Sequence, residues 1–383
     1  MNKLMNILNV NMSLDPVMGG GTAERTIQLS REMARNGVKV VILTTDIGLP
    51  EEYTKKNDGI EIIALPCLVK RFYFPKFSYK SIKELVVKSD VIHLMGHWTF
   101  INALIYYIAR RAKKPYVVCP AGALPIYGRS QIIKRLYNFI VGRRIISNAS
   151  ACIAIAANEE VHFKSYGVEA TKISFIPNGI NCDIFKYSEG KSFRGKFNLG
   201  DYPFILFMGR LNYIKGPDLL LRAFCGARKE LGGYHLVFVG PDGGMLGVLK
   251  NITSRLLFQD QVHFFGYLGG EDKVAAYQEA ELLVIPSRQE AMSIVVLEAG
   301  ASGKPVLITD QCGFNDVAEV VGGDVVSASV ESIQKGLIDI LKNTKKRQLM
   351  GQNLKKYVED NFTWKIAVVK YLQLYQVILQ DNK

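Results

Sequence analysis

The chain has 383 residues, a hydrophobic content of 48% and a formal net charge of +13. This length exceeds what one ordinary core holds and predicts two domains, with enough apolar surface to fill both. No apolar run is long enough for a spanning helix, and residues 1–8 favour a first strand over a secretion signal. Six scattered cysteines without a C-x-x-C pair indicate reduced thiols in a cytoplasmic protein.

Short apolar runs in the first half are typical of strands, and segments of helical periodicity separate several of them. The expected strands are residues 6–10, 38–45, 60–65, 91–95, 116–119, 152–156 and 173–176, and the expected helices include 22–35 and 100–111. Apolar strands that alternate with helices predict a mostly parallel sheet with both faces covered.

A more polar stretch, residues 187–200, interrupts this pattern, and a second series follows. Its expected strands are 204–208, 235–239, 262–265, 282–285 and 305–309, and its expected helices are 330–341, 345–362 and 364–379. We therefore predict an α/β protein of two doubly wound domains, 1–186 and 201–363, joined by a linker at 187–200. Two such domains facing each other would hold a ligand in the cleft between them, at the carboxyl ends of the strands. Periodicity alone leaves open which domain the last helix braces.

The positive charge is concentrated in the first half, where 25 Lys and Arg accompany 15 Asp and Glu through Gly190. One basic segment, residues 129–144, repeats apolar residues at helical spacing. A basic amphipathic helix suits an anionic membrane surface, and the simpler interpretation is a solvated basic face over an ordinary core stripe. Nucleic acid is not an expected partner, because no nucleic-acid motif accompanies the charge.

Residues 286–300 hold two carboxylates on either side of a predicted helix start. Glu290 lies in a polar loop, and Glu298 lies on the second turn of a helix that begins near Ser293. A helix N-terminus offers amide donors and a positive dipole end to a diphosphate, and carboxylates accept hydrogen bonds from hydroxyls. The pattern suits a sugar nucleotide, although most isolated Glu pairs lie on solvated faces.

Two glycine-rich loops follow other predicted strands. Gly20 and Gly21 precede a helix, where missing Cβ atoms let backbone amides approach a phosphate or sugar. Arg210 and Lys215 follow a strand, where two cations could neutralise the diphosphate that leaves in glycosyl transfer. A flexible turn and a pair of surface cations are the simpler interpretations.

Taken in order, these pieces resemble the retaining glycosyltransferases of family 4, which have the GT-B fold of two Rossmann-like domains. The matching elements are Gly19-Gly20-Gly21, Pro177-Asn178-Gly179-Ile180, Gly209-Arg210-Leu211 with Lys215-Gly216, Val239-Gly240, and Glu290 separated by seven residues from Glu298. The resemblance implies a metal-independent hexosyltransferase without a cofactor. It would move a sugar from a UDP- or GDP-linked donor to a saccharide acceptor, with retention of configuration.

The resemblance also assigns residues to the donor. The expected donor-binding set is Gly20, Gly21, Arg210, Lys215, Glu290, Ala291, Met292, Ser293 and Glu298, and the expected catalytic residues are Glu290, Arg210 and Lys215. Glu290 would contact the transferred sugar, Glu298 the ribose, and the two cations the diphosphate. The last helix, 364–380, is expected to return to the first domain.

Two departures limit what the resemblance transfers. After the first Glu many relatives have Gly-Phe-Gly, whereas this chain has Ala291-Met292-Ser293, so their sugar preference does not carry over. Where many relatives have a His, this chain has Ala121, whose methyl group cannot exchange a proton. His93 and His97 end a neighbouring strand and are either acceptor-side residues or structural histidines. If the departing diphosphate takes the acceptor's proton, a protein base is dispensable.

The sequence therefore predicts a cytoplasmic glycosyltransferase, peripheral at the inner face of the plasma membrane. Its basic, aromatic first domain favours a lipid-linked saccharide acceptor, as in assembly of bacterial surface polysaccharide. The alternatives are a non-catalytic protein that binds sugar nucleotides or polysaccharide, and a sugar-nucleotide epimerase on the same fold.

Overall fold

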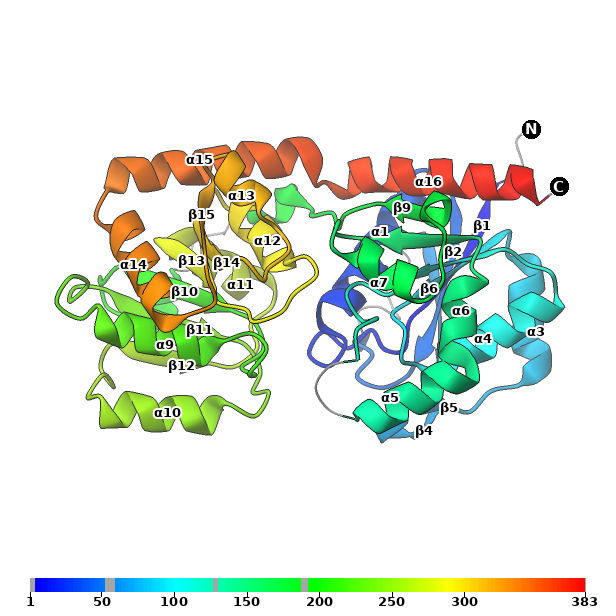
Figure 1. Ribbon diagram of the computed structural model, residues 1–383, viewed down its shortest axis with the longest axis horizontal. Helices are drawn as coiled ribbons and strands as arrows, with labels where there is room; N and C mark the ends of the chain where they lie inside the picture. Colours follow the sequence, from blue (N-terminus) through cyan, green and yellow to red (C-terminus); the bar gives the residue numbers. More distant parts are fainter. Residues whose placement is uncertain (1–3, 52–58, 127–129, 187–191, 383) are drawn as a thin grey trace. The chain divides into compact units, whose positions relative to one another are not determined.

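The computed structural model describes residues 4–51, 59–126, 130–186 and 192–382 (Figure 1). The chain divides into two compact units, Met1–Gly179 with Trp364–Lys383, and Ile180–Thr363. The first unit thus ends earlier than the expected boundary at residue 186. Ile180 already belongs to the second unit, because its N–H donates to the Phe362 carbonyl at 2.7 Å. Residues 187–191 of the expected linker lie outside the described residues.

The first unit is built around a seven-stranded sheet in the order β3-β2-β1-β6-β7-β8-β9. All its strand pairs are parallel. The strands are β1 (Asn6–Val10), β2 (Lys39–Thr45), β3 (Ile60–Leu65), β6 (Val91–Met95), β7 (Tyr116–Cys119), β8 (Ala151–Ala154) and β9 (Ile173–Phe175). These match the expected strands except for small differences at the ends. An additional hairpin of β4 (Cys67–Val69) and β5 (Phe74–Pro75) was not expected.

Helices accompany these strands, and each of those named here except α5 buries side chains in the unit. They are α1 (Gly20–Arg35), α3 (Tyr79–Lys88), α4 (Phe100–Arg111), α5 (Gln131–Tyr137), α6 (Arg143–Ser147), α7 (Glu159–Ser165) and α16 (Trp364–Asp381). The predicted basic helix over 129–144 is in fact α5 and α6 joined by a π-helical turn, Asn138–Gly142, and its first residue, Arg129, lies outside the described residues. Within the described ranges, no helix is long and apolar enough to cross a membrane.

The last helix, α16, belongs to the first unit and is anchored by two buried tyrosines. The Tyr371 hydroxyl accepts a hydrogen bond from Arg25 of α1 at 2.9 Å, and the Tyr375 hydroxyl lies 2.9 Å from Nδ1 of His93. Ile92 and Leu94 point into the apolar core on one face of the sheet. Because side chains alternate along a strand, His93 points to the other face, toward α16.

The second unit is built around a six-stranded parallel sheet in the order β12-β11-β10-β13-β14-β15. Its strands are β10 (Phe204–Met208), β11 (His235–Val239), β12 (Val262–Phe265), β13 (Leu282–Ile285), β14 (Val306–Thr309) and β15 (Gly323–Val326). Only β15 was not expected, since Asp324 breaks its apolar run. The chain order reverses between β10 and β13, and this switch point is where open α/β sheets bind ligands.

The helices of the second unit cover both faces of its sheet and close its core (Figure 1). They are α8 (Phe193–Lys196), α9 (Pro217–Gly226), α10 (Leu246–Arg255), α11 (Gly270–Glu279), α12 (Ile294–Ala301), α13 (Asp316–Glu319), α14 (Val330–Leu341) and α15 (Thr344–Asn361). The expected helix start near Ser293 is confirmed, because Ser293 is the residue before α12.

Candidate active site

The loops that follow β10 and β13 cross in close backbone contact at the switch point of the second unit. The Arg288 N–H donates to the Ile214 carbonyl at 2.7 Å. Gly216 has a left-handed φ of 65°, and a Cβ there would lie 2.0 Å from the Pro286 carbonyl oxygen. Only glycine therefore fits where the two loops cross, which explains why Lys215 is followed by glycine.

The loop after β14 closes on the same place. The Glu290 N–H donates to the Gln311 carbonyl at 2.9 Å. Gly313 has a φ of 63°, and a Cβ there would lie 1.8 Å from the Ala291 carbonyl oxygen. Three loops at the carboxyl ends of neighbouring strands thus fix the backbone around Glu290.

Glu290 and Lys215, both predicted site residues, are brought together as an ion pair. The Lys215 ammonium donates to one carboxylate oxygen of Glu290, and the Ser287 hydroxyl donates to the other at 2.9 Å. The side chains are 12% exposed at Glu290 and 29% at Lys215, so the pair is accessible from solvent on one side. A charged ligand could therefore reach both groups without unfolding the loops.

An arginine that the sequence did not single out supports this pair. Arg288 forms two hydrogen bonds to the Asp218 carboxylate, at 2.8 and 2.7 Å, and its guanidinium carbon lies 4.0 Å from the centre of the Tyr213 ring. A forked guanidinium and a carboxylate match in geometry and make a directional pair. The pair ties the first turn of α9 to the loop that carries Glu290. The 70 residues that separate Arg288 from Asp218 leave no local signal for it.

The N-terminus of α12 supplies the third part of the site. The Ser293 side chain is wholly buried, and its hydroxyl has no hydrogen-bond partner in the described part of the chain. It makes no side-chain cap to the helix either. The first amides of a helix and its dipole favour a negatively charged group at this end. Ser293 and α12 together therefore present hydrogen-bond donors suited to an anion.

Glu298 lies on the second turn of α12 and is bound to α11. Its carboxylate, 7% exposed, accepts hydrogen bonds from the Lys273 ammonium at 2.9 Å and the Tyr277 hydroxyl at 2.6 Å. Burial, and then the nearby carboxylate, raise the pKa of Tyr277 well above its ordinary value, so this hydroxyl stays a donor. Each carboxylate oxygen retains a second lone pair for a ligand hydroxyl. Neither Lys273 nor Tyr277 was predicted, since their partner is distant in sequence.

Arg210 follows β10 and lies over the loop after β11. A Cβ added at Gly243 would lie 2.9 Å from the Arg210 Cγ, so the stem of the arginine packs on that glycine. The Leu211 N–H donates to the Pro241 carbonyl at 3.0 Å, which joins the two loops. Arg210 thus belongs to the same carboxyl edge of the sheet as Lys215.

The glycines predicted to contact the donor from the first unit lie at the start of α1. Gly20 has a φ of 52°, a conformation that disfavours other residues, although no atom would obstruct its Cβ. At Gly19 a Cβ would lie 2.8 Å from both the Ala23 Cβ and the Asp15 carbonyl oxygen. The turn into α1 therefore requires glycine at Gly19 for space and favours it at Gly20 for backbone angle.

His97, a predicted acceptor-side residue, is enclosed in the first unit. Its Nε2 lies 3.0 Å from the Asn138 side-chain oxygen, and Trp98, Tyr137 and Tyr166 surround the ring edge to face. Burial lowers its pKa to about 4. The neutral, enclosed ring fits the structural interpretation of this histidine.

Ala121 and His93, both in the first unit, differ in how far they are buried. Ala121 follows β7 with a left-handed φ of 50° and is half-buried. The next N–H, of Gly122, donates to the Glu159 carboxylate, which also accepts from the Ile155 N–H at 2.7 Å. His93 is wholly buried, and burial lowers its pKa well below the ordinary value. His93 therefore faces α16, which fits the structural interpretation of this histidine.

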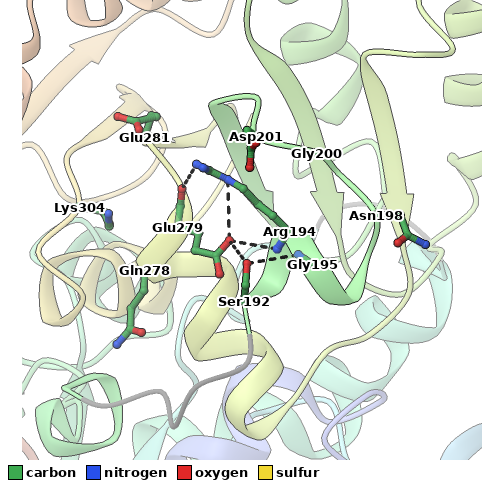
Figure 2. Close-up of a pocket in the computed structure, with 10 residues that line it drawn as sticks. All are labelled: Ser192, Arg194, Gly195, Asn198, Gly200, Asp201, Gln278, Glu279, Glu281 and Lys304. Atoms are coloured by element: carbon green, nitrogen blue, oxygen red, sulfur yellow. Dashed lines mark hydrogen bonds and ion pairs between the residues drawn. The ribbon is translucent and has the colours of Figure 1, made fainter.

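Figure 2 shows a different hollow of the second unit, about 680 Å³ in volume, at the amino-terminal edge of its sheet. The Glu279 carboxylate there accepts hydrogen bonds from the N–H groups of Phe193 and Arg194, at 2.5 and 3.0 Å, and so caps α8. Glu281 pairs with Arg347 of α15 at 2.8 Å. These contacts hold two helices to the sheet, and none of the predicted site residues lines the hollow.

Family models match both units. Residues 19–184 match glycosyltransferase family 4, and residues 190–357 match the group 1 glycosyl transferases. A D-inositol 3-phosphate glycosyltransferase of Mycolicibacterium smegmatis is 30% identical over 84% of this chain and 75% of its own length. An uncharacterised glycosyltransferase of Methanocaldococcus jannaschii is 28% identical over 98% of this chain and 99% of its own.

Solved structures agree in fold. HepE of Anabaena, crystallised with UDP and glucose, matches with a TM-score of 0.79 at 18% identity, over 98% of this chain and 99% of HepE. The sucrose-phosphate synthase of Thermosynechococcus elongatus matches with a TM-score of 0.77 at 20% identity, over 98% of this chain and 100% of that structure. Two doubly wound parallel units with these neighbours define the GT-B fold. The chain belongs to the family 4 glycosyltransferases, as the order of its motifs predicted.

Proposed function

We propose that the protein transfers a sugar from a nucleoside-diphosphate donor to a saccharide acceptor, with retention of configuration and without a metal ion. The observation that carries the proposal is the grouping of Lys215, Glu290 and the α12 N-terminus at one switch point, with Glu298 one turn along the helix. HepE was crystallised with UDP and with UDP-glucose, which supports a uridine donor here.

In this proposal the donor diphosphate lies at the N-terminus of α12, where Arg210 and Lys215 neutralise its charge. Lys215 then exchanges the Glu290 carboxylate for the diphosphate, and Glu290 becomes available to the hydroxyls of the sugar. Glu298 holds the ribose. The bond between the anomeric carbon and the diphosphate oxygen breaks as the charge on that oxygen is stabilised.

The acceptor hydroxyl forms the new glycosidic bond, and its proton passes to the departing diphosphate. This route needs no protein base, which is consistent with Ala121 and with an enclosed His97 whose pKa of about 4 makes it a weak base. The basic first unit supports a lipid-linked saccharide acceptor of the kind used in surface-polysaccharide assembly. The six free cysteines support a cytoplasmic location, where thiols stay reduced.

The assignment of Glu298 is tested by donor binding. We expect Glu298→Gln to weaken the binding of UDP or GDP about 10- to 100-fold, because hydrogen bonds to a charged group are the strong ones. Isothermal titration calorimetry measures this. Tyr277→Phe is the matched control, since it removes one partner of Glu298 but keeps the carboxylate, and we expect less than about a threefold change. An unchanged affinity in Glu298→Gln would remove its assigned role.

The reaction itself is tested with a panel of UDP- and GDP-sugars and saccharide acceptors. We expect nucleoside diphosphate to be released only when an acceptor is present. NMR of the product should show the same anomeric configuration as in the donor. Tight donor binding without turnover on any acceptor would favour a non-catalytic binding protein. Product without an acceptor would favour an epimerase.

A further inference from the structure

A stripe of large apolar side chains on α5 and the π-helical turn after it faces solvent. Ile132 is 81% exposed and Phe139 is 83% exposed, and their neighbours on the stripe are about half exposed. We call these residues the α5 patch: Ile132, Ile133, Leu136, Phe139 and Ile140. The spacing of Ile132, Leu136 and Phe139 places them on one face of the helix. This face points away from the core, whereas an ordinary surface helix turns such a stripe inward.

The inward side of the same segment is tightly anchored, so the outward direction of the α5 patch is fixed. The Asn138 amide contacts the ring of His97 at 3.0 Å and donates to the Tyr166 hydroxyl at 2.6 Å. The Tyr137 hydroxyl donates to the Thr99 carbonyl at 3.0 Å. A Cβ on Gly142 would lie 2.4 Å from the Asn138 oxygen, so glycine there preserves the anchor.

The segment of the chain that carries the α5 patch has charges of one sign. Between Asp90 and Glu159 the chain has nine Lys and Arg and no Asp or Glu. Arg135, Arg143 and Arg144 are exposed beside the apolar stripe. A long cationic side chain can keep its charge in water while its stem lies on an apolar surface. Cations that flank an exposed apolar stripe match the interface of an anionic bilayer, whose headgroups are acidic and whose interior is apolar.

A second segment with the same composition lies nearby. The hairpin of β4 and β5 exposes Leu68, Val69 and Phe72, and the cations Lys70 and Arg71 lie between Val69 and Phe72. Its Phe74 ring lies 4.2 Å from the ring of Phe100, the first residue of α4, and Tyr137 contacts Thr99 just before it. Both segments therefore flank the start of α4, and Figure 1 shows them at the same end of the first unit.

We propose that the α5 patch and the β4–β5 hairpin form a docking surface for an anionic lipid bilayer. Ile132 and Phe139 enter the apolar layer below the headgroups, while Arg135, Arg143 and Arg144 contact acidic lipid headgroups. Nucleic acid is a poor match, since a phosphate backbone offers nothing to five exposed apolar side chains. The surface lies beside the carboxyl edge of the sheet, because the ring of Tyr137 lies 5.8 Å from that of Trp98, which closely follows β6. If the proposed function holds, a lipid-linked acceptor would be presented there.

The experiment is co-sedimentation of the full chain with vesicles, which needs no donor or acceptor and is therefore independent of the proposed reaction. One vesicle set is pure phosphatidylcholine, and the other contains about 30 mol% phosphatidylglycerol, as in an anionic membrane. We expect at least about tenfold tighter binding to the anionic vesicles, weakened by added salt.

Two variants separate the apolar from the charged contribution. The apolar double variant is Ile132→Ser with Phe139→Ser, and the charge double variant is Arg143→Gln with Arg144→Gln. Each should reduce binding to anionic vesicles at least about tenfold. The matched apolar control is Val161→Ser, at an exposed position of α7. The matched charge control is Lys345→Gln with Lys346→Gln on α15. Both controls should bind vesicles as the wild type does. All substituted side chains are exposed, so circular dichroism melting should be unchanged.

Several results would overturn the proposal. Equal binding by Ile132→Ser with Phe139→Ser and by the wild type would exclude the patch as the bilayer contact. A wild type that stays in the supernatant with both vesicle sets would exclude a bilayer. The protein could instead self-associate in sedimentation velocity, lose this association with the serine substitutions, and bind no vesicles. That result would make the patch an interface between copies of the chain. A gel shift with single-stranded DNA that depends on Arg143 but not on Phe139 would indicate nucleic acid instead.

Discussion

Lys215 and Glu290 form an ion pair with each other, and this shapes how the proposed site would work. The Lys215 side chain is 29% exposed, so an anionic ligand can approach its ammonium from solvent. A diphosphate carries more negative charge than one carboxylate and, in the proposed reaction, would be the stronger partner for Lys215. Ser287 keeps Glu290 in place through its hydrogen bond to the other oxygen. In the proposed reaction, the pair would therefore hold two donor-binding groups in position before the donor arrives.

His97 links the first unit's stability to pH. Burial lowers its pKa to about 4, whereas the ring titrates near 6.5 in the unfolded chain. As the pH falls below 6.5 the unfolded chain binds a proton that the folded one does not, so stability is lost with falling pH until about pH 4. Between pH 7 and pH 5 this loss amounts to about 2 kcal/mol.

We expect His97→Gln, which keeps a hydrogen-bonding group beside Asn138, to remove this part of the pH dependence. Urea unfolding at pH 7 and at pH 5 gives the drop in the free energy of unfolding between the two pH values. We expect this drop to be smaller in the variant than in the wild type by roughly 2 kcal/mol. An identical drop in both proteins would mean that the ring is protonated in the fold at pH 5.

The limits of sequence reasoning at the site lie in contacts between distant residues. Glu290, Lys215 and Glu298 carry local signals, because each stands at a recognisable strand end or helix start. Tyr277 and Arg288 carry none, since a tyrosine on a helix or an arginine in a loop gains its meaning only from the partner that folding brings to it.

At the scale of elements, apolar runs of four to seven residues located nearly every strand, because a buried parallel strand needs little else. The β4–β5 hairpin was missed because its exposed aromatic and basic residues hide the alternation of a strand. The π-helical turn was missed because the helical period continues through it, while Gly142 and Asn138 shift the register by one residue. The periodicity of 129–144 therefore correctly predicted helix, and of its two interpretations the buried core stripe is wrong, because the apolar residues of α5 face solvent.

The attachment of α16 gives a prediction at the same scale. Tyr375→Phe leaves Nδ1 of wholly buried His93 without a partner, and its other nitrogen has none within the described residues. An unsatisfied buried group costs about 1–3 kcal/mol, and we expect a loss of this size in urea unfolding. Tyr107→Phe, on the exposed side of α4, is the matched control and should change stability by less than about 0.5 kcal/mol. Equal losses in both would show that the His93 contact does not anchor α16.

At the scale of the whole molecule, each unit has its own apolar core and its own parallel sheet. The predicted nucleotide-binding residues other than Gly20 and Gly21 all belong to the second unit. A ligand stabilises the part of a protein that binds it, by an amount set by its concentration relative to its dissociation constant. Nucleotide should therefore act first on the unit from Ile180 to Thr363.

We expect UDP at about 100 times its dissociation constant to stabilise the binding unit by about 2.7 kcal/mol, which raises its melting temperature by roughly 5–10 °C. Differential scanning calorimetry measures the shift, and hydrogen exchange shows where protection is gained. Protection should concentrate in residues 209–218 and 286–301, because these loops and α12 carry Lys215, Glu290 and Glu298. Glu298→Gln at the same UDP concentration should show a smaller shift, since its affinity is lower. Protection confined to the sheet of the first unit would place the nucleotide there and contradict the donor assignment of the second.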